Sequence, residues 1–280
     1  MTIAIVADST CDLDASHIAG LPITVVPLYI NVDGRSYLDG VDLSHAQFYE
    51  GLPRYRTHPT TSAPSIGTMV ALYRRLLAEG TDGIVSIHIA DSLSNTGNVA
   101  RLAAQAMPEV PIAVVDSGQI TLGIGHIILA AGEAARAGAD VAAIVARCND
   151  LRRRSYTFAA ADTLEYLRRS GRLSRVQASL GSILSVRPIL KMHDGVADVE
   201  RPRSSKKAME RLIGLTRDLG RLERLSILHG HAPQRAEELR ELAHDYFPTG
   251  QKPLCVEVTP AIGAHVGPNS VGLSCLVAAE

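Results

Sequence analysis

Short apolar runs alternate with longer amphipathic runs through the first half of the chain, which predicts strands that alternate with helices. The runs that predict strands are residues 3–7, 23–30, 83–89 and 112–115. The runs that predict helices are residues 44–50, 69–77 and 98–106, and a long Ala-rich region over 121–153. Because these strands are apolar throughout, we expect a parallel sheet that helices cover on both faces.

The pattern changes near residue 155, where hairpins begin to mix with helices. Strands are predicted at residues 156–160, 184–192, 196–199, 225–228, 254–258 and 271–277, and helices at 164–170 and 206–219. His193-Asp194-Gly195 predicts the turn of a hairpin. The fold class we expect is therefore α/β with two domains. Residues 1–155 form a parallel α/β sheet domain, and residues 156–280 form a mixed α+β domain.

Composition narrows the class of protein. The chain has 280 residues, of which 46% are hydrophobic, enough for a large core and two domains. Its net charge of -1 argues against nucleic acid as a partner and against an electrostatic membrane anchor. The longest late apolar stretch, residues 120–132, is too short to span a bilayer, so we expect no stable membrane insertion. The four cysteines are far apart, and the first seven residues lack a basic segment, which together predict a cytoplasmic protein without a signal peptide.

Several common catalytic motifs are missing from the sequence. The first strand-to-helix turn has no glycine, and there is no phosphate-binding GxxxxGK[ST] loop. The sequence also lacks a GxSxG elbow, an HExxH motif and any Cys/His spacing that suits zinc. These absences disfavour the usual nucleotide-dependent and metal-dependent enzymes.

Small hydroxyl side chains and one histidine are the remaining candidates for chemistry. Thr61 and Ser62 precede an apolar helical pattern, where they could cap the helix or bind an anion at its positive end. Ser94 follows a predicted strand, and parallel sheets bind ligands beyond the carboxyl ends of their strands. His265 lies between Gly263 and Gly267, which predicts an imidazole at a loop tip.

Eight stretches along nearly the whole chain together resemble the DegV family of bacterial fatty-acid-binding proteins. They are residues 8–13 (DSTCDL), 37–44 (YLDGVDLS), 61–65 (TSAPS), 93–96 (LSNT), 114–117 (VVDS), 170–173 (SGRL), 187–190 (RPIL) and the loop 263–272. The resemblance implies two domains with a long-chain fatty acid buried between them. It implies that Thr61, Ser62, Ser94 and His265 bind the acyl carboxylate, and that no cofactor is needed besides this ligand.

The resemblance further implies a protein partner, because some members of the family serve a fatty acid kinase. The carboxylate is presented to a separate ATP-dependent kinase subunit, which makes acyl-phosphate. Arg203 would lie near the phosphorylated group, and Arg172 on the face that docks the kinase. Both arginines lie beside predicted helix ends, where charged side chains usually face solvent. The sequence departs from the family at Asn95 and Gly97, where glycine and tyrosine are usual, and these changes bear on acyl-chain preference.

Two other functions fit the same residues. His265 could activate Ser94 or Thr61 in an acyl transferase or esterase. That enzyme would need a carboxylate to orient the histidine and an oxyanion hole, and the sequence assigns neither. A sensor of phosphorylated metabolites could use the same hydroxyls to bind phosphate.

Overall fold

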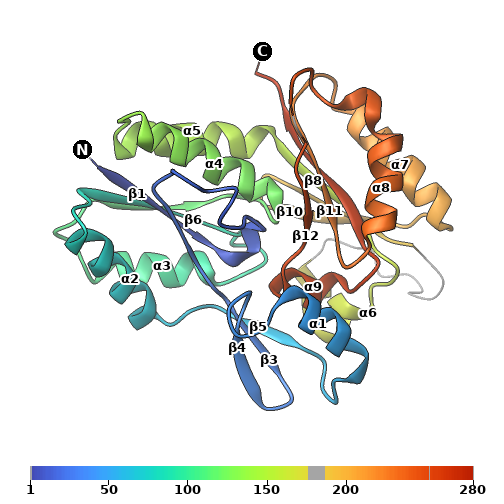
Figure 1. The fold of residues 1–280 in the computed structure, drawn as a ribbon, viewed down its shortest axis with the longest axis horizontal. Coiled ribbons are helices and arrows are strands. Elements are labelled where there is room, and N and C mark those ends of the chain that lie inside the picture. Colours follow the sequence, from blue (N-terminus) through green and yellow to red (C-terminus); the bar gives the residue numbers. More distant parts are fainter. Residues whose placement is uncertain (1, 176–186, 252, 280) are drawn as a thin grey trace.

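A four-stranded parallel sheet forms the first half of the molecule. The structure, a computed structural model, describes residues 2–175, 187–251 and 253–279 (Figure 1). The strands lie in the order β2 (Ile23–Val26), β1 (Ile3–Asp8), β6 (Gly83–His88) and β7 (Ile112–Asp116). All neighbouring pairs are parallel, which confirms the parallel sheet expected from the apolar runs.

Helices cover both faces of this sheet. One face carries α2 (Ile66–Ala78) and α3 (Thr96–Gln105), and the other carries α4 (Leu122–Arg136) and α5 (Val141–Arg154). Successive residues of β1 face opposite sides, so Val6 packs with α2 and α3 whereas Ile5 packs with α4. The helical region predicted over 121–153 is confirmed, and it consists of two helices because Gly138, with φ 86°, follows the end of α4 and reverses the chain.

A small antiparallel sheet lies beside the first. It consists of β4 (Arg35–Leu38), β3 (Tyr29–Val32) and β5 (Thr60–Ser62). The predicted single strand 23–30 is wrong, because the chain leaves the parallel sheet at Pro27, which has no backbone N–H to continue the ladder. The predicted turn at Asp33-Gly34 is confirmed, with positive φ at both residues.

The second half of the molecule is built on a six-stranded mixed sheet. Its strands lie in the order β10 (Val196–Glu200), β9 (Ile189–His193), β8 (Ser155–Ala160), β13 (Val271–Val277), β11 (Leu222–His229) and β12 (Cys255–Glu257). Within this sheet, β11 and β12 are the only described neighbours that pair in parallel, and the other neighbouring strands are antiparallel. Helices α7 (Ser205–Asp218) and α8 (Pro233–Leu242) cover one face, in line with the predicted mixed fold. The predicted strand 184–192 begins outside the described residues, and β9 covers residues 189–192 of its described part.

Helix α4 lies between the two large sheets (Figure 1). It contacts β1 and β6 on one side and β8 and β13 on the other. Nearly all of its side chains are buried, as expected for a helix that is apolar all round. His126 on α4 bonds Ser226 on β11 at 3.0 Å, which ties the helix to the second sheet.

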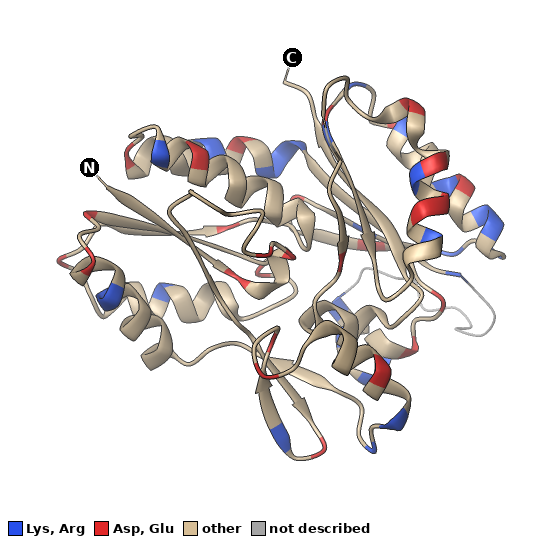
Figure 2. Ribbon diagram, viewed as in Figure 1, with Lys and Arg blue, Asp and Glu red and all other residues tan. Residues whose placement is uncertain are grey.

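Short helices close the other side of the interface. They are α1 (His45–Gly51), α6 (Glu165–Arg169) and α9 (Pro260–Val266). Ser44 caps α1 as predicted, in a capping box with Gln47. Many of the charged residues belong to the outer helices α5, α7 and α8 (Figure 2). Among the described residues, no helix combines the length and the apolar character that crossing a membrane requires.

Candidate functional site

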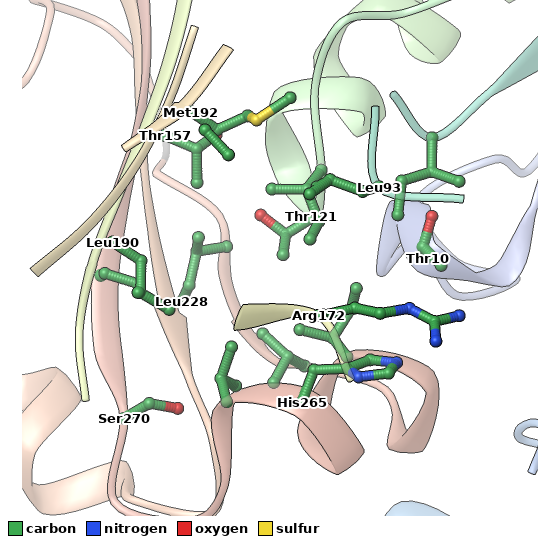
Figure 3. Close-up of a pocket in the computed structure, with 18 of the residues that line it drawn as sticks. Thr10, Leu93, Thr121, Thr157, Arg172, Leu190, Met192, Leu228, His265 and Ser270 are labelled. Carbon is green, nitrogen blue, oxygen red and sulfur yellow. The ribbon is translucent and has the colours of Figure 1, made fainter. Parts of the chain in front are cut away.

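A large cavity lies between the carboxyl ends of the parallel strands and the inner face of the six-stranded sheet (Figure 3). About 1010 Å³ of space is unfilled here, a volume that includes the open solvent at the mouth of the cavity. Most of its wall is apolar, including Ile89, Leu93, Ile120, Leu190, Met192 and Leu228. The loops after β1, β6 and β7 all contribute, which is where a parallel sheet is expected to bind a ligand.

Polar side chains gather at one side of this pocket. The Thr61 Oγ1 atom on β5 lies 2.9 Å from the His265 Nε2 atom on α9, although the two residues are 204 positions apart. Arg172 lies next to His265 (Figure 3), and Ser94 also lines the cavity. The structure thus brings together four residues that the sequence singled out.

His265 does not lie at a loop tip, so that expectation is wrong. It lies in the last turn of α9, which Pro260 begins at its first position. Gly267 follows the helix with φ 76° and ends it. The two glycines therefore belong to a short helix and its C-terminus, and not to a surface turn.

Burial keeps His265 neutral. Desolvation, together with the charge of Arg172 and the proximity of His58, lowers the pKa of the imidazole to about 3. A neutral imidazole carries one hydrogen, so the Thr61–His265 pair has one hydrogen left to donate. If Nε2 donates to Thr61, the free hydrogen is on the hydroxyl. If Thr61 donates to Nε2, it is on Nδ1, which is buried and has no partner among the described residues.

Two buried carboxyl groups hold the start of α9. The backbone N–H of Thr259 donates to Asp12 Oδ1 at 2.9 Å, and that of Ala261 donates to Asp39 Oδ1 at 3.3 Å. Burial raises the pKa of Asp39 to about 6 and raises the pKa of Asp12 well above its usual value. Both residues lie in stretches that resemble the family, but the sequence carries no signal that they position the helix of His265.

Thr61 and Ser62 do not share a role. Both lie on β5, and neighbouring residues of a strand point to opposite faces. Ser62 is exposed, accepts a hydrogen bond from Asn31 Nδ2 at 3.2 Å and is absent from the pocket wall as far as the structure describes it. The structure therefore places Ser62 away from the pocket in which the carboxylate was expected to bind, which disfavours its expected role. Neither residue caps α2, because Ser65 does so by accepting from the Thr68 N–H at 3.0 Å.

Ser94 reaches the pocket from the loop before α3. Its hydroxyl lies 2.8 Å from the Thr96 hydroxyl and also accepts from the Thr96 N–H. Asn95 has φ -88°, so it does not use the left-handed backbone that glycine permits. A side chain at Gly97 would meet the Asp91 carboxylate, which is ion-paired with Arg101.

The two arginines lie in different places. Arg172 was expected to face solvent, but it is half-buried along the pocket, and its guanidinium donates to the Ser170 carbonyl at 3.2 Å. Burial and the nearby Arg175 lower its pKa. Arg203 is exposed just before α7 and is not among the described residues that line the pocket.

Four further hydroxyl side chains line the cavity and were not predicted as site residues. They are Thr10, Thr121, Thr157 and Ser270. Thr10 belongs to a polar cluster at the end of β1, which the sequence did mark as a strand terminus. Thr121 and Thr157 border apolar runs, where a single threonine is typical of the core, so the pattern carried no signal for them.

The geometry disfavours catalysis by a Ser/His pair. Ser94 bonds Thr96, and the hydroxyl beside His265 is that of Thr61. Nδ1 of His265 has no carboxylate partner among the described residues. A pKa of about 3 also makes the imidazole a weak base at neutral pH.

Comparison with known proteins identifies relatives over the whole chain. The profile of a family described as "Uncharacterised protein, DegV family" matches residues 2–278. A DegV domain-containing protein of Streptomyces coelicolor is 38% identical over 275 residues, which cover 97% of each chain. A DegV family protein from Thermus thermophilus, whose structure is described as showing fatty acid binding, has a TM-score of 0.89 at 32% identity over 99% of this chain and 100% of its own. DegV from Bacillus subtilis, described as a fatty acid binding protein, has a TM-score of 0.88 at 29% identity over 99% of each chain.

Proposed function

The chain belongs to the DegV family, and we propose that it binds a long-chain fatty acid and presents the carboxylate to a separate kinase subunit. The observation that carries the proposal is a mainly apolar pocket in which Thr61, His265 and Arg172 form a polar cluster. Each buried CH₂ contributes about 0.8 kcal/mol, so a long acyl chain would supply most of the affinity. The fatty acid binding described for the Thermus thermophilus and Bacillus subtilis proteins supports the same ligand class.

We assign the carboxylate to the polar side of the pocket. His265 donates from Nε2 to Thr61, which leaves the Thr61 hydroxyl hydrogen for a carboxylate oxygen. Arg172 supplies the positive charge that a buried anion requires, and its half-buried position supports this role. Ser94 lines the same cavity, and we propose its hydroxyl as a second donor to the carboxylate. Partner docking by Arg172 stays a prediction beside this head-group role.

The kinase would transfer the γ-phosphoryl group of ATP to the bound carboxylate. A carboxylate oxygen forms the new bond to phosphorus, the bond to the β-phosphate oxygen breaks, and ADP leaves. Such a transfer develops negative charge that a nearby arginine stabilises. Arg203 is exposed, as a residue that meets a partner must be, and we propose it for this role.

The division into domains and the compartment also belong to this proposal. We place the boundary at residue 155, where the first strand of the six-stranded sheet begins. We assign the protein to the cytoplasm, which its four free cysteines support.

The ligand is tested by denaturing extraction of freshly purified protein, followed by mass spectrometry of the extract. We expect a long-chain fatty acid in a molar ratio near one to the protein. Protein without any acyl chain, and without affinity for an added long-chain acid, would overturn the proposal. Stoichiometric phosphate compounds in place of lipid would favour a metabolite sensor instead.

The partner role is tested separately with the Arg203→Ala variant. We expect it to retain the fatty acid and to lose at least about tenfold in acyl-phosphate formation when a fatty acid kinase subunit and ATP are added. Arg240→Ala is the matched control, because Arg240 is an exposed arginine on α8 that is paired with Glu237. Equal turnover of both variants and the unmodified protein would make Arg203 an ordinary surface charge.

A further inference from the structure

One hydroxyl inside the pocket has no hydrogen-bond partner in the described part of the chain, and the proposed function does not use it. Thr121 is only 4% exposed, and its Oγ1 atom has no hydrogen-bond partner among the residues that the structure describes. Figure 3 shows this oxygen pointing into the cavity, toward the side where Thr157 and Leu190 lie. Thr121 lines the pocket wall immediately before α4.

The other hydroxyls along the described wall are all hydrogen-bonded within the protein. Thr10 donates to Asp8, Thr61 pairs with His265, Ser94 pairs with Thr96, Thr157 donates to Gln119, and Ser270 donates to the Gly267 carbonyl. A buried hydroxyl without a partner destabilises the protein, whereas valine would fill the same space without that cost. Thr121 is therefore better suited to a polar atom of a ligand than to an apolar chain.

The backbone directs this hydroxyl away from the helix that it precedes. A threonine at this position usually caps the helix by accepting from a first-turn N–H. Thr121 has φ 55° and ψ -140° and makes no side-chain cap to α4. The N-terminal end of this 15-residue helix thus carries its partial positive charge without a side-chain cap, beside an unpartnered hydroxyl. Together they favour an oxygen atom that can accept a hydrogen bond.

The neighbouring charges favour a neutral oxygen over a second carboxylate. Lys191 is a cation in the wall on the sheet side, and its ammonium group already lies 2.8 Å from Asp198 and 3.1 Å from Glu200. Arg172 lies with His265, on the side that we assign to the head group (Figure 3). A hydroxyl or keto oxygen needs no counter-ion, so it suits this part of the wall.

We propose that Thr121 and the N-terminal end of α4 form a second polar subsite, which binds an oxygen atom carried along the acyl chain. The ligand class is a long-chain hydroxy fatty acid. The inference rests on the proposed function, because the carboxylate held near His265 sets how far along the chain the oxygen must be.

The test compares octadecanoic acid with a series of hydroxyoctadecanoic acids that carry the hydroxyl at successive carbons. Dissociation constants are measured by calorimetry for the delipidated protein and for Thr121→Val, which removes only the hydroxyl. We expect the best-bound isomer to lose about five- to thirtyfold in affinity with Thr121→Val. Octadecanoic acid should bind the variant at least as tightly as it binds the unmodified protein. Thr121→Ser, which keeps the hydroxyl, should retain the preference within about twofold.

The outcomes separate this inference from the proposed function. If octadecanoic acid binds, but Thr121→Val changes the affinity for every isomer by the same factor as for octadecanoic acid, the subsite is wrong and the proposed function stands. If no long-chain acid binds, both are wrong. Should Thr121→Val fail to fold, the titration of the unmodified protein with the series still tests the subsite. A subsite requires that affinity reach a maximum at one position of the hydroxyl along the chain. A series that is flat or uniformly weaker than octadecanoic acid would overturn it.

Discussion

Replacing Thr61 with valine tests the assignment of the carboxylate most directly. The change removes one hydroxyl and keeps the shape and the β-branched character that suit a strand. The Thr61 Oγ1 atom lies 2.9 Å from His265 Nε2 and lines the pocket, so its loss removes a bond to the imidazole and the donor proposed for the ligand.

The expected magnitude follows from the charge of the ligand. A hydrogen bond to a charged group contributes roughly 1.5–3 kcal/mol, which corresponds to a loss of roughly 10- to 150-fold in affinity. Thr61→Val also leaves His265 Nε2 without this partner, in a side chain whose Nδ1 already has none among the described residues. Destabilisation of the protein should therefore accompany the weaker binding. The apolar wall is untouched, so the gain in affinity with each added CH₂ group of the fatty acid should stay the same.

The assay is calorimetric titration of delipidated protein with fatty acids of increasing length. Ser62→Ala is the matched control, because Ser62 is the next residue of the same strand and its side chain is exposed on the opposite face. We expect Ser62→Ala to bind like the unmodified protein. Unchanged affinity in folded Thr61→Val, or an equal loss in Ser62→Ala, would refute the assignment.

Three further predictions concern Arg172, His265 and Asp39. Arg172→Ala should weaken fatty acid binding by roughly 10- to 150-fold, whereas Arg168→Ala should not, because Arg168 is exposed and paired with Glu165. Equal retention of the fatty acid by both variants would show that Arg172 does not bind the head group. Because the pKa of His265 is about 3, its imidazole should stay neutral between about pH 5.5 and 8. An NMR titration of His265 with a midpoint near its ordinary value would contradict this. The pKa of Asp39 is raised from 3.8 to about 6 in the folded protein, so its protonated form stabilises the fold below pH 3.8 and that contribution is lost as the pH rises through 6. The unfolding free energy of the unmodified protein relative to Asp39→Asn should fall by on the order of 3 kcal/mol from pH 3.5 to 7, and a pH-independent difference in denaturant titrations would contradict the raised pKa.

Local patterns were sufficient for much of the fold. The apolar runs predicted the strands of the parallel sheet, because a strand covered on both faces needs apolar side chains at every position. Ser44 was identified as a helix cap, and Asp33-Gly34 as a turn, because these features depend on neighbouring residues. The same reasoning failed where the chain changes sheets at Pro27, since an apolar run does not show which strand it will pair with.

The sequence by itself determined the layers of the fold, the strand ends that face the pocket and the small set of hydroxyl and histidine candidates. Only the tertiary structure decided which of them meet. Thr61 faces the pocket and Ser62 does not, because strand alternation depends on which face of β5 is covered. His265 reaches Thr61 because Asp12 and Asp39 hold the start of α9 from the other half of the molecule. Contacts between residues more than two hundred positions apart arise from the packing of whole elements, and no local pattern encodes them.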